Sequence, residues 1–291
     1  MDIVTRHYNL IDSNIPKELS GFQIALFSDV HTHYLGIDGE ELTEAFDKIN
    51  PDIVVFAGDA CNKGRYNVDT TTGLENIEEL FVALASRYEV YYVNGNHDKR
   101  VELLCNGGDI LSDCYINSKI EKARLRYDPN GSSAFDDYIS VIKSAGVHYL
   151  SNESIYLEDK NINIIGLDLP LKYYRHKPEE LTKDELIRLI GVPRNDTYNL
   201  LIAHTPQFFE TYAAWGADLT LSGHIHGGII RIPFIGGLLS PDRTFFPKYD
   251  YGLFDISGKK LIVSSGVGFT NFRTKHNNPP EIVHITLNSK E

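Results

Sequence analysis

The sequence predicts an α/β protein in which crossover helices connect the strands of a parallel sheet. Three observations support this fold class. The chain has 291 residues, 42% of them hydrophobic, which is enough for a substantial core. Apolar, β-rich runs alternate with helical patterns in its first half, and the alternation returns in its second half. Because no internal repeat or long Pro/Gly linker interrupts it, we expect a single domain over residues 1–291.

The first half contains three apolar runs that end in polar residues. The strands are expected at 22–30, 51–60 and 89–98, and the helices at 39–50 and 74–86. Strand, helix, strand, helix, strand is the order typical of parallel sheets. Residues 105–133 then interrupt the alternation without a clear rhythm, so they are either a lid beside the polar strand ends or a surface insertion without function.

The second half repeats the pattern and then changes. Strands are expected at 161–168, 198–206 and 217–228, and helices at 184–191 and 206–216. Three short β-like runs follow at 252–257, 259–265 and 281–287. We expect them to form a paired, largely antiparallel closing sheet.

Charge and composition exclude some classes of protein. The net charge is −12, from 28 basic and 40 acidic residues, so nothing in the total drives binding to extended nucleic acid. Three cysteines without CxxC spacing indicate neither a disulfide framework nor a zinc ribbon. The N-terminal residues contain no apolar run of signal or membrane-spanning length, which predicts a soluble, cytoplasmic protein. A membrane-associated or surface-exposed location is the alternative if an N-terminal anchor has been removed.

Polar residues collect where the predicted strands end. Because the carboxyl ends of parallel strands meet at one edge of a sheet, these side chains should converge there. They are Asp29, His31, Asp59, Asn96, His97, Asp98, His204, His224 and His226.

Each of these residues also has an ordinary explanation, as a turn residue, a helix cap or a buried, hydrogen-bonded histidine. Jointly these explanations are weak, because five of the 11 histidines lie at the strand ends. His224 and His226, in LSGHIHGG, would point to the same side if an extended conformation continued through them.

The donor set indicates a metal site. His, Asp and Asn without Cys suit Mn, Fe or Zn. The donors are too many for one tetrahedral ion, so two divalent or mixed-valence ions that share a carboxylate are more economical. A pair of ions is typical of enzymes that hydrolyse phosphoric esters.

Five motifs, SDVH, AGDA, GNHD, AHTP and SGHIHGG, resemble in this order those of the calcineurin-like metallophosphoesterase superfamily. The segments after SGHIHGG are similar to a bacterial branch that includes UDP-2,3-diacylglucosamine pyrophosphatases. The resemblance implies a four-layer α/β/β/α sandwich with mixed sheets. It further implies that one metal is held by Asp29, His31 and His226, the other by Asn96, His204 and His224, and that Asp59 bridges them.

The same resemblance implies roles for the remaining members of GNHD. His97 would be a non-ligand that stabilises the transition state or protonates the leaving oxygen, and Asp98 would orient its imidazole. The nucleophile would be a metal-bound hydroxide, because the ions lower the pKa of water toward 7.

One departure from the family pattern affects the predicted substrate contacts. Asn62 stands where many relatives have a further Asp, and it and Arg65 are weak candidates for phosphate contacts, as is His33. The apolar stretch at 229–239 is either a half-buried hairpin or the wall of a channel for a greasy substrate that touches a membrane.

The sequence therefore predicts a dimetal phosphohydrolase, either a phosphodiesterase or a pyrophosphohydrolase. Its partners would be a small phosphodiester, a nucleotide or a lipid-linked phosphate, with peripheral membrane contact in the last case and no extended nucleic acid. One alternative is an enzyme like UDP-2,3-diacylglucosamine pyrophosphatase, and another is a non-catalytic metal-binding scaffold.

Overall fold

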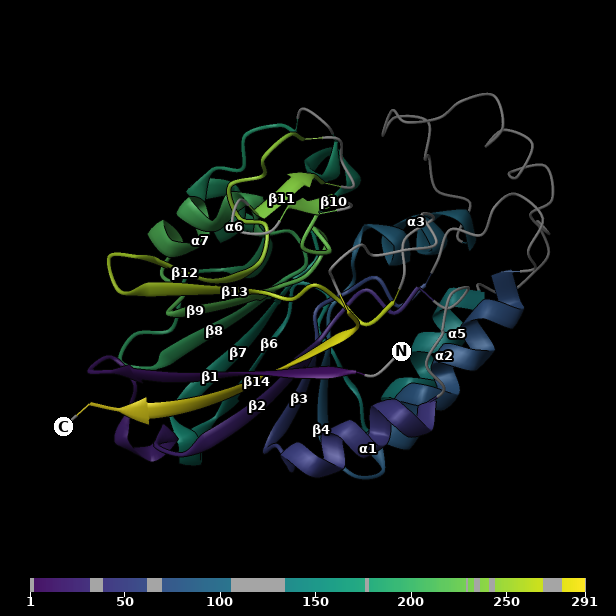
Figure 1. Ribbon diagram of the computed structural model, residues 1–291, viewed down its shortest axis with the longest axis horizontal. Helices are drawn as coiled ribbons and strands as arrows, with labels where there is room; N and C mark the ends of the chain where they lie inside the picture. The colour runs from purple at the N-terminus through teal and green to yellow at the C-terminus, as the bar shows by residue number, and fades with distance from the viewer. Residues whose placement is uncertain are drawn as a thin grey trace.

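The computed structural model describes residues 3–31, 39–61, 70–105, 134–175, 178–228, 230–232, 236–240, 244–268 and 279–290. Within this part of the chain, two six-stranded sheets pack face to face, and helices cover the outer face of each (Figure 1). The four-layer α/β/β/α sandwich with mixed sheets is thereby confirmed.

The first sheet has the strand order β1-β14-β2-β3-β4-β5. Its strands are β1 (Val4–Asp12), β14 (Glu281–Ser289), β2 (Phe22–Phe27), β3 (Ile53–Phe56), β4 (Glu89–Tyr92) and β5 (His148–Tyr149). From β2 to β5 all neighbours are parallel, whereas β14 runs antiparallel to β2 and parallel to β1.

The second sheet has the strand order β12-β13-β9-β8-β7-β6. Its strands are β12 (Gly252–Ile256), β13 (Lys259–Val263), β9 (Leu219–Ser222), β8 (Tyr198–Ala203), β7 (Ile162–Leu167) and β6 (Ser154–Leu157). The four central strands are parallel, and β12 and β6 close the two edges in antiparallel fashion. β7, β8 and β9 are buried along their whole length, as expected for strands covered on both faces.

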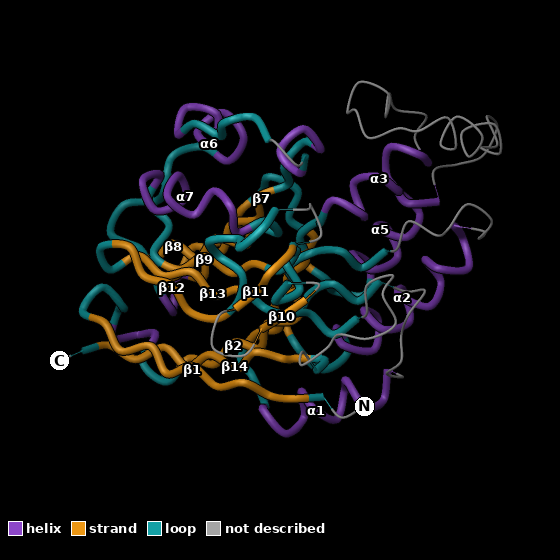
Figure 2. The backbone as a smooth tube through the Cα atoms, turned by 45° about the horizontal axis from the view of Figure 1, so that its top comes forward, coloured by secondary structure: helices purple, strands orange, loops and turns teal. Residues whose placement is uncertain are grey.

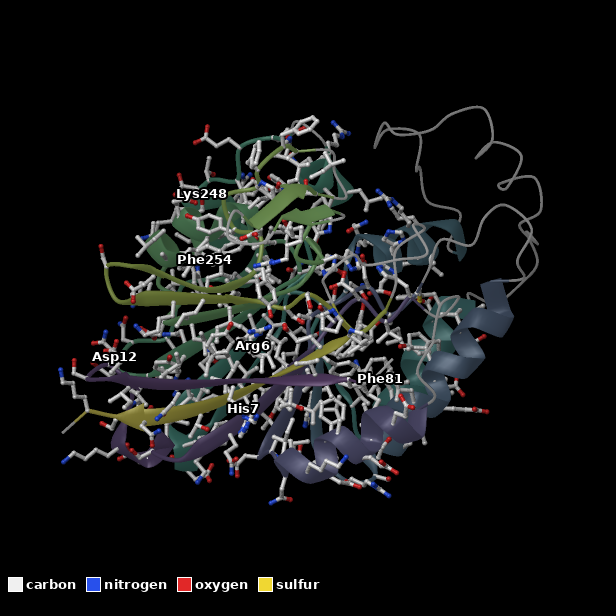
Figure 3. All side chains as sticks on the ribbon, in the orientation of Figure 1. Arg6, His7, Asp12, Phe81, Lys248 and Phe254 are labelled. Atoms are coloured by element: carbon white, nitrogen blue, oxygen red, sulfur yellow. The ribbon has the colours of Figure 1, made fainter. Side chains whose placement is uncertain are left out.

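Helices pack on the outer faces of both sheets (Figure 2). They are α1 (Gly39–Ile49), α2 (Thr70–Ala85), α3 (Asn96–Cys105), α5 (Ala134–Ser144), α6 (Lys183–Ile190) and α7 (Phe209–Trp215), with 3-10 turns η1 (Lys17–Leu19), η4 (Glu158–Lys160), η5 (Leu171–Tyr174) and η6 (Pro206–Phe208). α1, α2 and α5 pack on the first sheet, where Phe81 of α2 joins an aromatic cluster with Phe27 and Phe56 (Figure 3). α6 and α7 pack on the second sheet. A separate apolar core fills the space between the sheets.

Three features differ from the sequence-based expectations. β14 does not close the second sheet with β12 and β13, because it crosses to the first sheet and pairs with β2. The run at 89–98 is extended only to Tyr92, and helix α3 begins at Asn96. β1 was not predicted, because it is an edge strand held by its backbone and only Leu10 is buried among its residues.

The apolar stretch after the histidine pair forms the expected hairpin, from β10 (Ile230–Ile232) and β11 (Gly236–Leu239). Most of the 105–133 insertion, residues 106–133, lies outside the described residues. In the described part of the chain, no helix has the length and apolar character needed to cross a membrane.

Candidate metal centre

The predicted site residues follow the carboxyl ends of strands from both sheets. Asp29 and His31 follow β2, and Asp59 follows β3. The other members lie in the first turn of α3 (Asn96, His97 and Asp98), directly after β8 (His204), and after β9 (His224 and His226). The two sheets therefore bring together at one edge all nine residues that the sequence singled out.

Five of these residues have a left-handed backbone. The φ angles are 55° at Asp29, 48° at His31, 61° at Asp59, 70° at His224 and 54° at His226. Such values cost energy for residues other than glycine and tend to cluster at functional sites. β9 ends at Ser222, so the histidine pair is not an extended strand, and the simple alternation argument for it is wrong. The left-handed backbone at His224 and His226, and not the alternation of an extended strand, therefore sets the directions of the two imidazoles.

One group of donors consists of Asp29, His31 and His226, all buried. The Nε2 atoms of the two histidines are 3.2 Å apart. Oδ1 of Asp29 lies 3.4 Å from Nε2 of His226 and 3.9 Å from Nε2 of His31. A metal with bonds of about 2.0 to 2.2 Å holds its ligand atoms roughly 3 to 3.5 Å apart, so this spacing fits one ion.

A second group consists of Asp59, His204 and His224. Nδ1 of His204 lies 2.7 Å from the carbonyl oxygen of Ala57, which turns Nε2 toward Asp59, 3.2 Å from its Oδ2. Asp59 also has ligand atoms within 4.8 Å of those of His31 and His97. This carboxylate therefore belongs both to the second group and to a third, formed with His31 and His97, and His31 links that third group to the first.

Polar atoms left without hydrogen bonds show that the residues fit a cation. Among the described residues, Oδ1 of Asn96 is buried and lacks a hydrogen-bond partner. Oδ1 of Asp29 is buried and has no hydrogen bond, only the imidazole of His226 at 3.4 Å. A buried carboxylate or amide oxygen in this state costs free energy unless a ligand or cation compensates it. The donors are oxygen and imidazole nitrogen, the set that Mn, Fe and Zn accept.

The pKa values of the two buried carboxyl groups, Asp29 and Asp59, are shifted in opposite directions. Burial raises the pKa of Asp29. Burial would also raise the pKa of Asp59, but His204 and His97 outweigh it and hold this pKa well below its usual value. The Asp59 carboxylate in turn overcomes burial at His204 and raises its pKa to about 9. Burial lowers the pKa of His97 well below its ordinary value, which favours a neutral imidazole there.

Asp98 makes contacts that the sequence did not indicate. Its Oδ2 accepts hydrogen bonds from the backbone N–H groups of Asp59 (2.8 Å), Ala60 (3.3 Å) and Gly95 (2.9 Å), and its Oδ1 accepts one from Cys61 (2.8 Å). The carboxylate thus ties the loop after β3 to the start of α3. The idea that Asp98 orients the His97 imidazole stays a prediction.

The loops after β3 and β4 approach each other so closely that Gly95 is required. A Cβ atom at this position would lie 2.1 Å from Oδ1 of Asp59. The same oxygen accepts a hydrogen bond from the backbone N–H of His97 at 2.7 Å.

Ser28 is a site residue that the sequence analysis did not identify, and its hydroxyl group donates a hydrogen bond to Oδ2 of Asp29 at 2.5 Å. The weak candidates His33, Asn62 and Arg65 lie outside the described residues.

Comparison with known proteins agrees with this geometry. Residues 22–228, well over half of the chain, match the family model of calcineurin-like phosphoesterases. The chain belongs to the calcineurin-like phosphoesterase family. It is therefore a metallophosphoesterase, a hydrolase of a dimetal-dependent family, as the sequence predicted.

Several relatives resemble the chain over much of its length. It is 26% identical to the uncharacterized metallophosphoesterase YkuE of Bacillus subtilis, over 99% of this chain and 86% of that protein. It is 25% identical to the UDP-2,3-diacylglucosamine pyrophosphatase LpxG of Chlamydia trachomatis, over 92% of this chain and 85% of that protein. A shorter match, 27% identical over half of each chain, is to the phosphodiesterase YaeI of Escherichia coli.

Proposed function

We propose that this metallophosphoesterase uses two metal ions to hydrolyse a small phosphodiester or a diphosphate. The observation that carries the proposal is a set of donor groups that are linked through His31 and Asp59, with His97 beside them. Asp29, His31 and His226 would hold one ion, Asn96, His204 and His224 the other, and Asp59 would bridge them. Mn, Fe and Zn are all compatible with these donors. When bound, two such ions would lower the pKa of water toward neutrality and offset charge on the phosphoryl oxygens.

His97 is the residue available for acid–base chemistry. Its Nε2 lies 4.0 Å from Oδ2 of Asp59, and its side chain is 26% exposed, whereas the Asp59 side chain is 2% exposed. His97 is thus on the open side of the centre, where a substrate would enter. We assign it the task of stabilising charge on the phosphoryl group or donating a proton to the leaving oxygen, which typically contributes about 100- to 10,000-fold.

A lipid-linked diphosphate is the second candidate substrate. Phe245 and Phe246 are 69% and 59% exposed, and they follow the β10–β11 hairpin, to which Phe246 is tied by a backbone hydrogen bond to Leu238. The start of β11 packs on the loop after His226, because a Cβ at Gly237 would be 3.2 Å from the carbonyl oxygen of Gly227. An exposed aromatic pair this close to the centre suits an acyl chain or peripheral membrane contact, and the similarity to LpxG is consistent with such a substrate.

Two other functions are less well supported. The complete donor set argues against a scaffold without catalysis. A net charge of −12 argues against an enzyme that tracks extended nucleic acid.

The test is hydrolysis of bis(p-nitrophenyl) phosphate beside p-nitrophenyl phosphate by the chain loaded with Mn²⁺. We expect turnover of the diester, its loss in Asp59→Ala, and a reduction of about 100- to 10,000-fold in His97→Gln. Asp47→Ala is the control, because Asp47 is an exposed carboxylate paired with Arg87 on the protein surface. Full diester turnover by Asp59→Ala would refute the shared-carboxylate assignment. UDP-2,3-diacylglucosamine, assayed in parallel, tests the second candidate.

A further inference from the structure

The turn η5 carries two neighbouring tyrosines that are both buried and belong to one apolar core. Their rings contact different parts of the molecule. The ring of Tyr173 packs against Phe208 with centroids 5.7 Å apart. The ring of Tyr174 packs against two imidazoles, with centroids 5.4 Å from His224 and 5.9 Å from His204. Only Tyr174 of this pair therefore has a ring contact to the candidate metal centre among these described contacts.

Both imidazoles make contacts besides those with Tyr174. His204 is anchored at Nδ1 by the carbonyl oxygen of Ala57, so the orientation of its ring is set on that side. His224 sits on a left-handed backbone, and its backbone N–H donates to Oδ2 of Asp29 at 3.1 Å. The centroid of its ring is 5.0 Å from that of His204 and 5.4 Å from that of Tyr174. The Tyr174 ring is thus a packing partner of both imidazoles.

The contact between Tyr174 and His224 depends on an aromatic ring. The ring planes are 73° apart, a T-shaped arrangement. Aromatic rings carry negative charge on the face and positive charge at the edge, so such pairs attract. A Phe side chain would keep this contact, whereas a Leu side chain would lose it.

We propose that Tyr174 is a positioning residue that holds His224 and His204 in the orientation needed for the second metal ion. This inference rests on the proposed dimetal function. It assigns the role to the aromatic ring rather than to the hydroxyl group. It also assigns the role to one half of the centre, since within the described part of the chain the ring contacts of Tyr174 are to His204 and His224 of the group around Asp59.

The experiment is a calorimetric titration of the metal-stripped full chain with Mn²⁺, for wild type, Tyr174→Phe, Tyr174→Leu and Tyr173→Leu. We expect two binding events in wild type and in Tyr174→Phe. In Tyr174→Leu one event should weaken by about 10- to 100-fold while the other is unchanged, the size typical when a residue that orients a ligand is lost. Tyr173→Leu is the matched control, because it removes an equally buried ring from the same turn. It should leave both affinities within about 3-fold of wild type.

A second readout is the electron paramagnetic resonance spectrum of the Mn²⁺-loaded protein. Wild type and Tyr174→Phe should give the signal of a magnetically coupled pair of ions, and Tyr174→Leu at the same Mn²⁺ concentration should give that of isolated ions. If Tyr174→Leu does not fold, Tyr174→Met replaces it, because Met is a flexible filler of core space.

Three results would overturn the inference: unchanged Mn²⁺ binding in Tyr174→Leu, equal weakening in Tyr174→Leu and Tyr173→Leu, or equal weakening in Tyr174→Phe and Tyr174→Leu. The second would mean that Tyr174 only fills the core, and the third that its hydroxyl group matters. Failure of the proposed function is recognisable separately, because wild type would then bind no pair of Mn²⁺ ions.

Discussion

At the scale of single residues, the centre depends on contacts that orient the ligands as much as on the ligands. The Asp98 carboxylate accepts hydrogen bonds from four backbone N–H groups in two loops, one of which contains Asp59. Burial and the nearby charge of Asp59 raise the pKa of Asp98 to about 6. Gly95 allows those two loops to meet. Neither contact follows from the GNHD motif alone.

Replacing Asp98 by Asn should therefore destabilise the protein. The amide group keeps the size of the carboxylate but offers only one acceptor oxygen. With that oxygen at the Oδ2 position, the N–H of Cys61 loses its acceptor, and the other three N–H groups lose the charge of theirs. We expect a loss of about 2 to 4 kcal/mol in the free energy of unfolding, measured by urea denaturation of the metal-stripped protein. Asp159→Asn, at an exposed position in η4, should change it by less than about 0.5 kcal/mol. Equal values for the two variants would contradict this role.

At the scale of elements, β14 and the β12–β13 hairpin connect the two sheets. Lys260 of β13 lies 3.3 Å from Oδ2 of Asp12, at the end of β1, and 2.8 Å from Oδ2 of Asp255 in β12 (Figure 3 marks Asp12). The N–H of Asn14 and the Lys260 ammonium lower the pKa of Asp12 below its ordinary value of 3.8, against the opposing effect of burial. The first sheet is thus joined to the second by an ion pair at their edges.

The ion pair between Asp12 and Lys260 predicts how the stability of the protein depends on pH. A carboxyl group whose pKa is lower in the folded state stabilises the protein above the pKa of the unfolded state, and it loses this effect as pH falls through the folded pKa. Asp12→Asn should lower the free energy of unfolding at pH 7 by up to about 1 kcal/mol, because the pair is partly exposed. The difference from wild type should shrink as pH falls below 3.8. The measurement is urea denaturation across pH, repeated in a Lys260→Met background, where the effect of Asp12→Asn should be smaller. A difference that grows toward acid pH would contradict the assignment.

At the scale of the whole molecule, the candidate metal centre lies where the carboxyl edges of two sheets meet, so its proposed ligands come from distant parts of the chain. Asp29 and His226 are separated by 197 positions in the sequence yet have ligand atoms 3.4 Å apart. Ions bound between the sheets would therefore stabilise the folded state by mass action.

Removal of metal should lower the melting temperature. An ion present at 100 times its dissociation constant adds about 2.7 kcal/mol. For a chain of this size that corresponds to roughly 4 °C for each ion, so a chelator should lower the melting temperature of the Mn²⁺-loaded protein by about 4 to 9 °C. The measurement is differential scanning calorimetry with and without chelator. His226→Ala should respond less to the chelator, and an identical response would argue against His226 as a ligand.

The sequence by itself determined the fold class, the family motifs and the list of polar residues at the strand ends, because strand periodicity and motif order are local properties of the chain. It did not determine β1, whose pairing is made by backbone groups, or the position of β14, which depends on which sheet edge is open. Nor did it determine that five site residues adopt left-handed backbones, that Asp98 binds backbone amides, or that Tyr174 lies against two histidines. Only the tertiary structure decided these, because each depends on the close approach of segments that are far apart in the sequence.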